Sequence, residues 1–143
     1  GFEICKTFNC FSGEIKLISN AKIEMNKVDY NTFDWGKLPN QNLYSWDFNL
    51  EVIKNGDYEY YQITKDNFLE SFFVVNPKNE YLAQFEILKE SDGCWNRLFK
   101  GIKEVSNSIK IINVDTRLNE KINFISSIGL SNTVNQYEME MNI

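Results

Sequence analysis

The sequence predicts an α/β domain of the mixed-sheet (α+β) type, with a central β-sheet flanked by helices. Three short strands follow one another between Tyr58 and Leu88, which is typical of an antiparallel meander. The chain then closes with a strand, an amphipathic helix and a second strand between Ile109 and Ile143. A meander that leads into such a crossover indicates a sheet with parallel and antiparallel pairs and helices packed on its faces.

At the N-terminus we expect a β arm and a linker over residues 1–40, followed by the main domain over residues 41–143. The segment Phe2 to Asn9 is predicted to form a strand, and Ser12-Gly13 a turn. Residues Glu14 to Ser19 are predicted to return as a second strand, so the arm would be a hairpin.

The linker region is expected to hold a short strand over residues 22–28 and one helical turn over residues 31–35. Gly36, Pro39 and Asn40 then mark a loop, because glycine, proline and asparagine favour turn conformations.

A helix is predicted from Ser45 to Asn55. Trp46, Leu50 and Ile53 fall on one face at helical spacing, and Gly56 follows as a stop signal. This helix opens the main domain.

The meander consists of three predicted strands: Tyr58–Thr64, Leu69–Asn76 and Tyr81–Leu88. The turn between the first two is Lys65-Asp66-Asn67. In the second turn, Asn76 to Asn79, Pro77 suits the first central position.

A second amphipathic helix is predicted from Gly93 to Asn107, with Asp92 as its N-cap. Its apolar residues recur at the i, i+3, i+4, i+7 spacing of one helical face: Trp95, Leu98, Phe99, Ile102 and Val105.

The closing unit begins with a strand from Ile109 to Val114. Asp115 is the expected N-cap of a helix from Arg117 to Ile128, and Gly129 ends that helix. A long strand with alternating polar and apolar residues then runs from Asn132 to Ile143.

The composition excludes several classes of function. The 143 residues carry a formal net charge of −5, so neither a nucleic acid nor a membrane surface is an expected partner. There is no apolar run long enough to cross a membrane and no signal-peptide pattern. The chain has no histidine, and its 3 cysteines are widely spaced, so we expect no metal site and no Ser-His or Cys-His catalysis. Because the number of cysteines is odd and no CxxC pair is present, we expect all three to be reduced, as in a cytoplasmic protein.

The order of these elements, from about residue 45 to residue 143, resembles that of the GNAT N-acetyltransferases. The last 35 residues carry the resemblance best, with the Gly129-Leu130 hinge and the Gln136-Tyr137-Glu138-Met139 segment. The resemblance implies a GNAT-like acyl-CoA N-acyltransferase fold. It also implies a V-shaped gap between the strands Tyr81–Leu88 and Ile109–Val114, where the family binds acyl-CoA.

The chain departs from the family in the loop that would hold the CoA pyrophosphate. Family members have an RxxGxG pattern there, whereas residues 89–94 keep one glycine, Gly93, and add Glu90 and Asp92. Carboxylates repel a diphosphate and compete for the same N–H donors. If acetyl-CoA is bound at all, the candidate binding residues are Ile87, Leu88, Gly93, Cys94 and Trp95.

A second departure lies in the last helix. Many family members place a tyrosine, the general acid, four residues before the glycine, and that position is Ile125 here. Glu86 is the one candidate for a general base, with a surface or hydrogen-bonded glutamate as the alternative. By the alternation of side chains along a strand, Glu86 is expected on the same face of the sheet as Leu82, Gln84 and Leu88.

A small-molecule pocket is an alternative use of the aromatic residues around the meander. Its candidate residues are Tyr60, Phe73, Tyr81 and Asn113, although large side chains are equally needed for the core of the sheet.

We therefore expect a C-terminal GNAT-like domain of an N-acetyltransferase that is noncatalytic by itself and binds no cofactor as an isolated chain. Its role would be to complete a substrate cleft, to dock or to dimerise. The segment from Gly1 to Asn9 resembles the last strand of a preceding GNAT domain, so that domain or a homodimer partner is the expected partner. The alternative for this segment is a free-standing protein whose arm packs on its own sheet. One alternative is an active acetyl-CoA-dependent enzyme with divergent motifs. The other is a binding module for a small molecule or a peptide.

Overall fold

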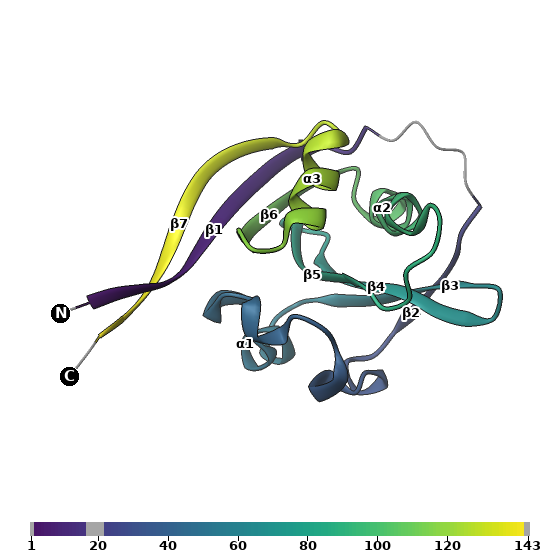
Figure 1. The fold of residues 1–143 in the computed structure, drawn as a ribbon. Helices are drawn as coiled ribbons and strands as arrows, with labels where there is room; N and C mark the ends of the chain where they lie inside the picture. Colours follow the sequence, from purple (N-terminus) through teal and green to yellow (C-terminus); the bar gives the residue numbers. More distant parts are fainter. Residues whose placement is uncertain (1, 17–21, 142–143) are drawn as a thin grey trace.

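The computed structural model describes residues 2–16 and 22–141 (Figure 1). These residues form a mixed sheet of seven strands, with three α-helices and four short 3-10 helices. The strands are β1 (Phe2–Glu14), β2 (Glu24–Val28), β3 (Glu59–Lys65), β4 (Phe68–Asn76), β5 (Tyr81–Ile87), β6 (Ser108–Asp115) and β7 (Ser131–Met141). The helices are η1 (Tyr30–Thr32), η2 (Trp35–Lys37), η3 (Gln41–Leu43), η4 (Trp46–Phe48), α1 (Leu50–Asn55), α2 (Cys94–Val105) and α3 (Asn119–Ser127).

The strand order in the sheet is β2-β3-β4-β5-β6-β1-β7. Five of the neighbouring pairs are antiparallel, and β5 and β6 are parallel. Within the described residues, the register of this parallel pair joins only Tyr81 with Lys110, close to the start of both strands. By contrast, β5 pairs with β4 from Tyr81 to Ile87. The two halves of the sheet therefore meet at the beginning of β5 and part toward its end.

Two hydrophobic cores lie on opposite faces of the sheet. The first packs α2 and α3 on one face, and its members Phe73, Leu98, Phe99 and Ile125 are fully buried. The second lies under the segment from η1 to α1, where Phe33, Trp35, Phe48, Ile53, Tyr60 and Phe72 come together. Figure 1 shows α2 and α3 above the sheet and α1 below it. Most aromatic side chains of the meander are therefore part of one core or the other.

The structure confirms the meander, the two later helices and the long closing strand. The side chain of Asn76 accepts hydrogen bonds from the N–H groups of Lys78 and Asn79, which fixes the predicted turn around Pro77. Gly129 has a φ of 91°, the left-handed conformation that ends a helix most readily at glycine. The closing strand is described as far as Met141.

The predicted N-terminal hairpin is wrong in the part that the structure describes. Residues 2–14 form one strand, β1, which lies between β6 and β7 and is antiparallel to both. Ser12 pairs with Lys110 on one side and with Ser131 on the other, so the chain continues straight through the expected turn. The remainder of the expected return strand, at residues 17–19, lies outside the described residues.

Residues before position 40 contribute to both the sheet and the second core. Strand β2 forms the edge of the sheet next to β3, and Phe33 and Trp35 are buried against Phe72 and Tyr60. The boundary after residue 40 remains a prediction.

The helix predicted over residues 45–55 is shorter than expected. The chain forms the 3-10 turn η4, and α1 begins only at Leu50. Asn49 separates the two because its backbone is extended, with a φ of −71° and a ψ of 172°, and its side chain accepts a hydrogen bond from the N–H of Val52. An N-cap of this kind starts a new helix. Gly56 is the C-cap, as predicted.

Both predicted aspartate caps are wrong. Helix α2 has Gly93 at its N-cap, with a φ of 76° and no side-chain cap, and the carbonyl of Asp92 accepts a hydrogen bond from Arg97 instead. Helix α3 begins at Asn119, beyond the reach of Asp115. Asp115 accepts hydrogen bonds from the backbone N–H and the guanidinium of Arg117, so it holds the turn that follows β6.

Among the described residues, none of the helices combines the length and the apolar character that a membrane span requires.

Candidate functional site

A cluster of buried polar side chains lies where β5 and β6 part. Glu86 comes from β5, Lys121 from the first turn of α3, and Asn40 and Tyr44 from the segment around η3. The side chains of Glu86 and Lys121 are only 3% and 5% exposed. Buried ionisable groups in a cleft are a common mark of a functional site, although structural ion pairs share this property.

The position of Glu86 depends on a bulge in β5. Val74 pairs with Gln84 and Val75 with Leu82, so Ala83 is an extra residue in the strand. Leu82 belongs to the first core, beneath α2 and α3. Gln84 and Glu86 instead contact Gln41 and Asn40, on the other face of the sheet. The sequence predicts Leu82, Gln84 and Glu86 on one face of the sheet, and this prediction is wrong for Leu82. The bulge changes the face toward which the residues after it point.

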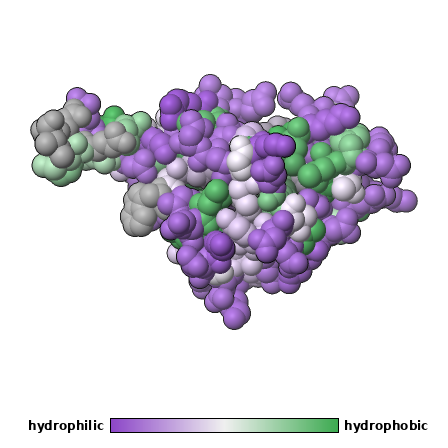
Figure 2. Space-filling view, turned by 90° about the horizontal axis from the view of Figure 1, so that it is seen from below, coloured by the Kyte–Doolittle hydropathy of each residue, from purple (hydrophilic) through white to green (hydrophobic). Residues whose placement is uncertain are grey.

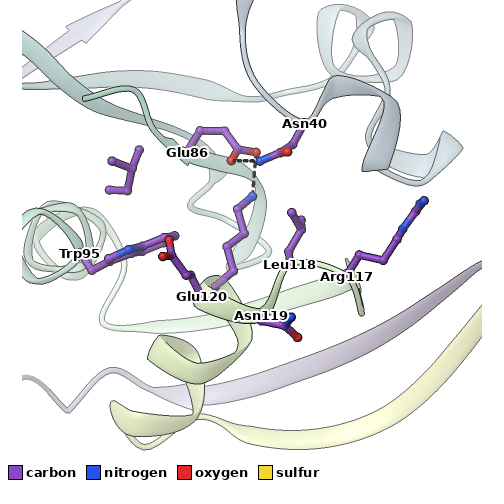
Figure 3. Close-up of a pocket in the computed structure, with 9 residues that line it drawn as sticks. Asn40, Glu86, Trp95, Arg117, Leu118, Asn119 and Glu120 are labelled. Carbon is purple, nitrogen blue, oxygen red and sulfur yellow. Dashed lines mark hydrogen bonds and ion pairs between the residues drawn. The ribbon is translucent and has the colours of Figure 1, made fainter. Parts of the chain in front are cut away.

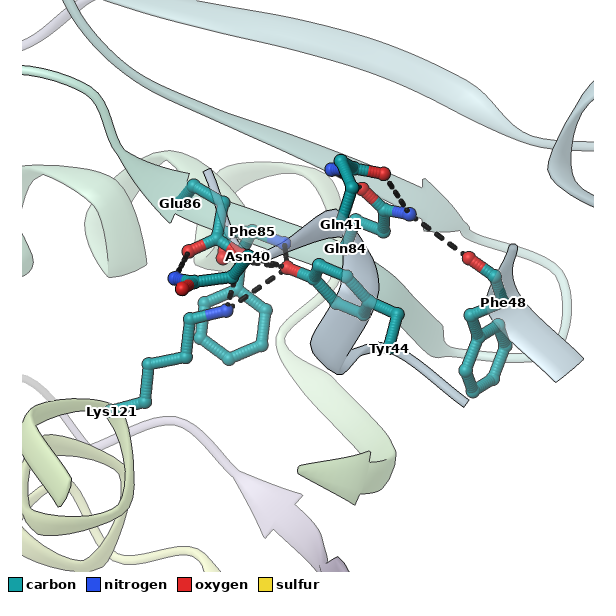
Figure 4. A network of polar contacts seen from close by, with 8 residues as sticks. All are labelled: Asn40, Gln41, Tyr44, Phe48, Gln84, Phe85, Glu86 and Lys121. Atoms are coloured by element: carbon teal, nitrogen blue, oxygen red, sulfur yellow. Dashed lines mark hydrogen bonds and ion pairs between the residues drawn. The ribbon is translucent and has the colours of Figure 1, made fainter. Parts of the chain in front are cut away.

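Three side chains share the carboxylate of Glu86 (Figure 4). Lys121 Nζ lies 2.7 Å from Oε2, and the Tyr44 hydroxyl donates to the same oxygen. Asn40 Nδ2 donates to Oε1 at 2.9 Å. Lys121 also donates to the Tyr44 hydroxyl oxygen at 2.9 Å. Both oxygens of Glu86 are therefore occupied, and its charge is matched by a cation.

Burial and the charge of Glu86 shift the pKa values of Lys121 and Tyr44. Burial lowers the pKa of Lys121, and the attraction of the Glu86 carboxylate opposes this shift. Burial also raises the pKa of Tyr44, and the negative charge of Glu86 raises it further, so the phenol keeps its proton. The ammonium of Lys121 lies 4.4 Å from the ring centre of Phe85 and 4.9 Å from that of Tyr44, at cation–π range.

The lysine side chain joins elements from the two faces of the sheet. Helix α3 packs with α2 over the first core, whereas Tyr44 and Asn40 belong to the segment on the opposite face. Lys121 begins on α3, and its ammonium lies between the ring of Phe85 in the first core and the Tyr44 hydroxyl at the edge of β5 (Figure 4).

A second set of hydrogen bonds fixes the segment that carries Tyr44. Gln84 Nε2 donates to the carbonyl of Phe48 at 2.9 Å, and the side chains of Gln41 and Gln84 bond to each other in both directions. The Tyr44 hydroxyl also accepts from the backbone N–H of Phe85 at 3.2 Å. These hydrogen bonds hold the segment against β5, the strand that also carries Glu86.

Beside this cluster lies the first hollow, with a volume of about 360 Å³ (Figure 3). Its wall combines a few apolar side chains with amide and charged groups: Asn40, Glu86, Ile87, Trp95, Arg117, Leu118, Asn119, Glu120 and Lys121. The indole of Trp95 is held by stacking on Phe124, with ring centres 5.8 Å apart.

The second hollow, of about 580 Å³, lies in front of the N-terminus of α2 and also contacts Trp95. It is lined by Glu90, Ser91, Asp92, Gly93, Cys94, Trp95, Asn96 and Phe124. The N–H groups of a first helical turn have no partner within the helix, so this hollow faces potential donors. It also faces the carboxylates of Glu90 and Asp92.

A buried ion pair holds the loop around the second hollow. Arg97 Nε donates to Glu70 Oε2 at 2.8 Å, and Arg97 Nη2 donates to Ser91 Oγ at 2.9 Å and to the carbonyl of Asp92 at 2.7 Å. Burial by itself raises the pKa of Glu70, but the hydrogen bonds from Arg97 and Ser91 outweigh it and leave this pKa below its usual value. A Cβ added to Gly93 would lie 2.9 Å from Arg97 Nη1, so the arginine packs directly against the glycine.

The structure brings together most of the residues that we considered for acetyl-CoA. Gly93 and Cys94 line the second hollow, Ile87 lines the first, and Trp95 lines both. Leu88 packs instead against the second core.

The four candidates for a small-molecule pocket are not brought together. Tyr60 belongs to the second core and Phe73 to the first, so the sheet separates them. Tyr81 lines a separate hollow of about 260 Å³ beside β1 and β6. Asn113 is buried, and its side chain contacts Cys10 and Ser45. Among the described residues, no group of three or more acidic, cysteine or histidine side chains is placed to hold a metal ion.

Sequence reasoning missed Lys121, Tyr44 and Asn40. One signal was present for Lys121: it lies one helical turn before Ile125, so it shares the buried face of an amphipathic helix. For Tyr44 and Asn40 the sequence offers no comparable signal, because an irregular segment brings them to β5.

No family model matches the sequence, and neither does any curated protein. Solved structures with a similar fold include the following two. A protein from Drosophila shares 11% identity at a TM-score of 0.68, over 97% of this chain and 51% of that one. A conserved protein of unknown function from Staphylococcus epidermidis shares 13% identity at a TM-score of 0.62, over 100% of this chain and 64% of that one. The chain therefore spans between half and two thirds of the length of these two proteins, and has in common with them a mixed α/β fold.

Proposed function

We propose that this chain is a GNAT-like domain that does not transfer acetyl groups by itself and serves a partner domain or subunit. Three features support the GNAT resemblance. The order of elements from α1 to β7 follows the family order, the sheet is mixed, and β5 and β6 part beyond Tyr81. In this family the gap between these two strands receives acyl-CoA.

The Lys121–Glu86 ion pair is the observation that carries the proposal. Lys121 reaches into the gap between β5 and β6, where its ammonium is bonded to Glu86 and Tyr44. An acyl chain in this gap would have to displace the lysine. Separating a buried ion pair leaves two charges without partners, which costs about 3–5 kcal/mol. The side chains present therefore do not fit an acyl group at this position.

The side chains at three further positions also support a noncatalytic domain. Ile125, at the position of the family tyrosine, is fully buried in the first core and has no proton to donate. Glu86 accepts three hydrogen bonds and faces a cation, so it is poorly placed to take a proton from an amine. Glu90 and Asp92 place negative charge at the hollow where the phosphates of CoA would lie.

Calorimetric titration with acetyl-CoA tests this proposal. We expect no heat of binding from the wild-type chain at protein concentrations of about 100 μM, with coenzyme A as a second ligand. Micromolar binding by the wild-type chain would contradict the noncatalytic role.

An active acetyltransferase with divergent motifs is the second candidate. The two hollows that meet at Trp95, and the uncapped N-terminus of α2, favour it. A thiol-release assay with acetyl-CoA and a panel of amines separates the two candidates. Turnover that is lost in the Glu86→Gln variant would favour the enzyme, and a lack of turnover by the folded chain would support the noncatalytic domain.

A further inference from the structure

The outer part of the β1–β7 ribbon carries a group of exposed apolar side chains. Figure 1 shows this ribbon extending away from the rest of the molecule, and Figure 2 shows apolar colouring on the part that protrudes. Its members are between 54% and 68% exposed: Phe2, Ile4, Tyr137, Met139 and Met141. We call these five residues the ribbon face.

The register places all five side chains on one side of the ribbon. Phe2 pairs with Met141 and Ile4 with Met139, and directly paired residues of antiparallel strands project to the same side. Tyr137 follows by alternation along β7. A bulge after Ile4 shifts the register of β1 by one residue.

The opposite side of the ribbon is charged and attached to the body of the protein. The bulge turns Lys6 to this side, where it pairs with Glu138 at 3.4 Å and donates to the carbonyl of Tyr44 at 3.0 Å. The ribbon face therefore points away from this attachment. Among its described side chains and those paired with it, none is charged.

From these observations we infer that the ribbon face is an interface with a second copy of this chain, packed face to face about a two-fold axis. The pairing register makes Ile4 and Met139 the centre of the face. In a two-fold interface each residue meets the same surface on the other copy, so a charged face would repel itself. The whole chain carries a net charge of −5, and the ribbon face is a large surface on which two copies meet without like-charge contact.

The size of the face fits a weak dimer. A large side chain presents about 200 Å², so five of them at these exposures offer roughly 600 Å² per copy. Two such faces together bury about 1,200 Å², which lies at the lower end of specific interfaces. We therefore expect a dissociation constant in the micromolar range. This inference does not depend on the proposed function, because acetyl-CoA binding and self-association are measured separately.

Sedimentation velocity from about 1 μM to about 1 mM tests the inference. We expect wild type to pass from monomer to dimer, and Met139→Glu to weaken the dimer at least about 100-fold, because each copy would bury an unpaired carboxylate. Val134→Glu is the matched control. Val134 is 55% exposed on the same strand, but by alternation its side chain projects to the opposite side of the ribbon from Met139. The Val134→Glu variant should therefore still dimerise.

Cross-linking gives an independent measurement. In a Cys5→Ser background, Met139→Cys should be joined to its copy by a short bis-maleimide, and Val134→Cys should not. A wild-type chain that stays monomeric at every concentration would overturn the inference, as would a dimer that Met139→Glu leaves intact.

Discussion

Two hollows that share Trp95 as a lining residue are built in different ways. Where β5 and β6 part, the polar groups of Glu86, Tyr44 and Lys121 are buried and bonded to one another. In front of α2, a wider hollow faces a helix terminus that no side chain caps. At the first place the polar groups are bonded to one another. At the second place the N–H of Cys94 donates to the carbonyl of Ser91, and the carboxylates of Glu90 and Asp92 line the hollow. The difference indicates that the polar groups at the first place link α3 to β5 and to the segment around η3.

The comparison predicts its largest effect at Lys121. Replacing it by methionine keeps much of the volume but leaves Glu86 buried without its cation, so we expect a loss of about 3–5 kcal/mol in the free energy of unfolding. Urea unfolding measures this loss. The double variant Lys121→Met/Glu86→Gln should lose less than the single variant, because no charge remains buried.

The matched control for Lys121 is Lys37. Its ion pair with Asp34 has side chains that are 85% and 66% exposed, so Lys37→Met should change stability by no more than about 0.5 kcal/mol. Equal effects of the two substitutions would show that the buried ion pair contributes no more to stability than the exposed one.

A somewhat smaller effect is expected at the ion pair behind the second hollow. Glu70→Gln leaves Arg97 without its carboxylate and should cost about 2–3 kcal/mol near neutral pH. The pKa of Glu70 is lowered in the folded protein, so the unfolded chain binds the proton more readily. The stability from this pair is therefore complete above about pH 5 and is lost as the pH falls through the folded-state pKa.

Unfolding curves between about pH 3 and pH 7 check this pH dependence. In Glu70→Gln the acid-side slope should become shallower than in wild type. An unchanged slope would mean that Glu70 has an ordinary pKa in the folded protein.

A backbone substitution in the same loop should have an effect of about 1–2 kcal/mol. Gly93 has a φ of 76°, and an added Cβ would lie 2.9 Å from Arg97 Nη1, so Gly93→Ala combines backbone strain with a close contact. Gly36→Ala is the control, because Gly36 has no positive φ and the nearest atom to its Cβ would be 3.8 Å away. Thermal unfolding of both variants gives the difference.

The smallest predicted effect concerns the charges of the second hollow. Replacing Glu90 by glutamine and Asp92 by asparagine removes two carboxylates without changing the backbone. If charge is what keeps phosphates away from α2, this variant should bind coenzyme A about tenfold better than wild type at low salt, with the gain falling as salt is added. A gain that does not depend on salt would point to shape as the obstacle.

The fold was largely predictable because it follows periodic patterns. The meander, α2 and β7 repeat apolar residues at the spacing of their elements, and Gly129 ends α3 as its position suggests. The placement of β1 was not predictable, because a strand does not encode which neighbours it will pair with. Its two partners lie far along the chain: Glu14 pairs with Ser108 of β6, 94 residues later, and Phe2 pairs with Met141 of β7, 139 residues later.

The candidate site was predictable only in part. Gly93, Cys94 and Trp95 line a hollow because they begin a helix, which the sequence indicates. The contacts of Glu86 depend on the extra residue Ala83 in β5, and a bulge leaves no periodic trace in a strand of seven residues. Because of the same bulge, the side chain of Glu86 does not face α2 and instead contacts Lys121 in the gap between β5 and β6.

The most direct test of the account is a titration of the isotope-labelled chain with acetyl-CoA, followed by amide NMR. The amides of Gly93, Cys94 and Trp95 report on the second hollow, and that of Lys121 reports on the gap between β5 and β6. We predict no saturable shift at any of these amides up to about 1 mM ligand. Saturable shifts at both places, with one micromolar dissociation constant, would contradict the claim that the lysine closes this cleft to an acyl group.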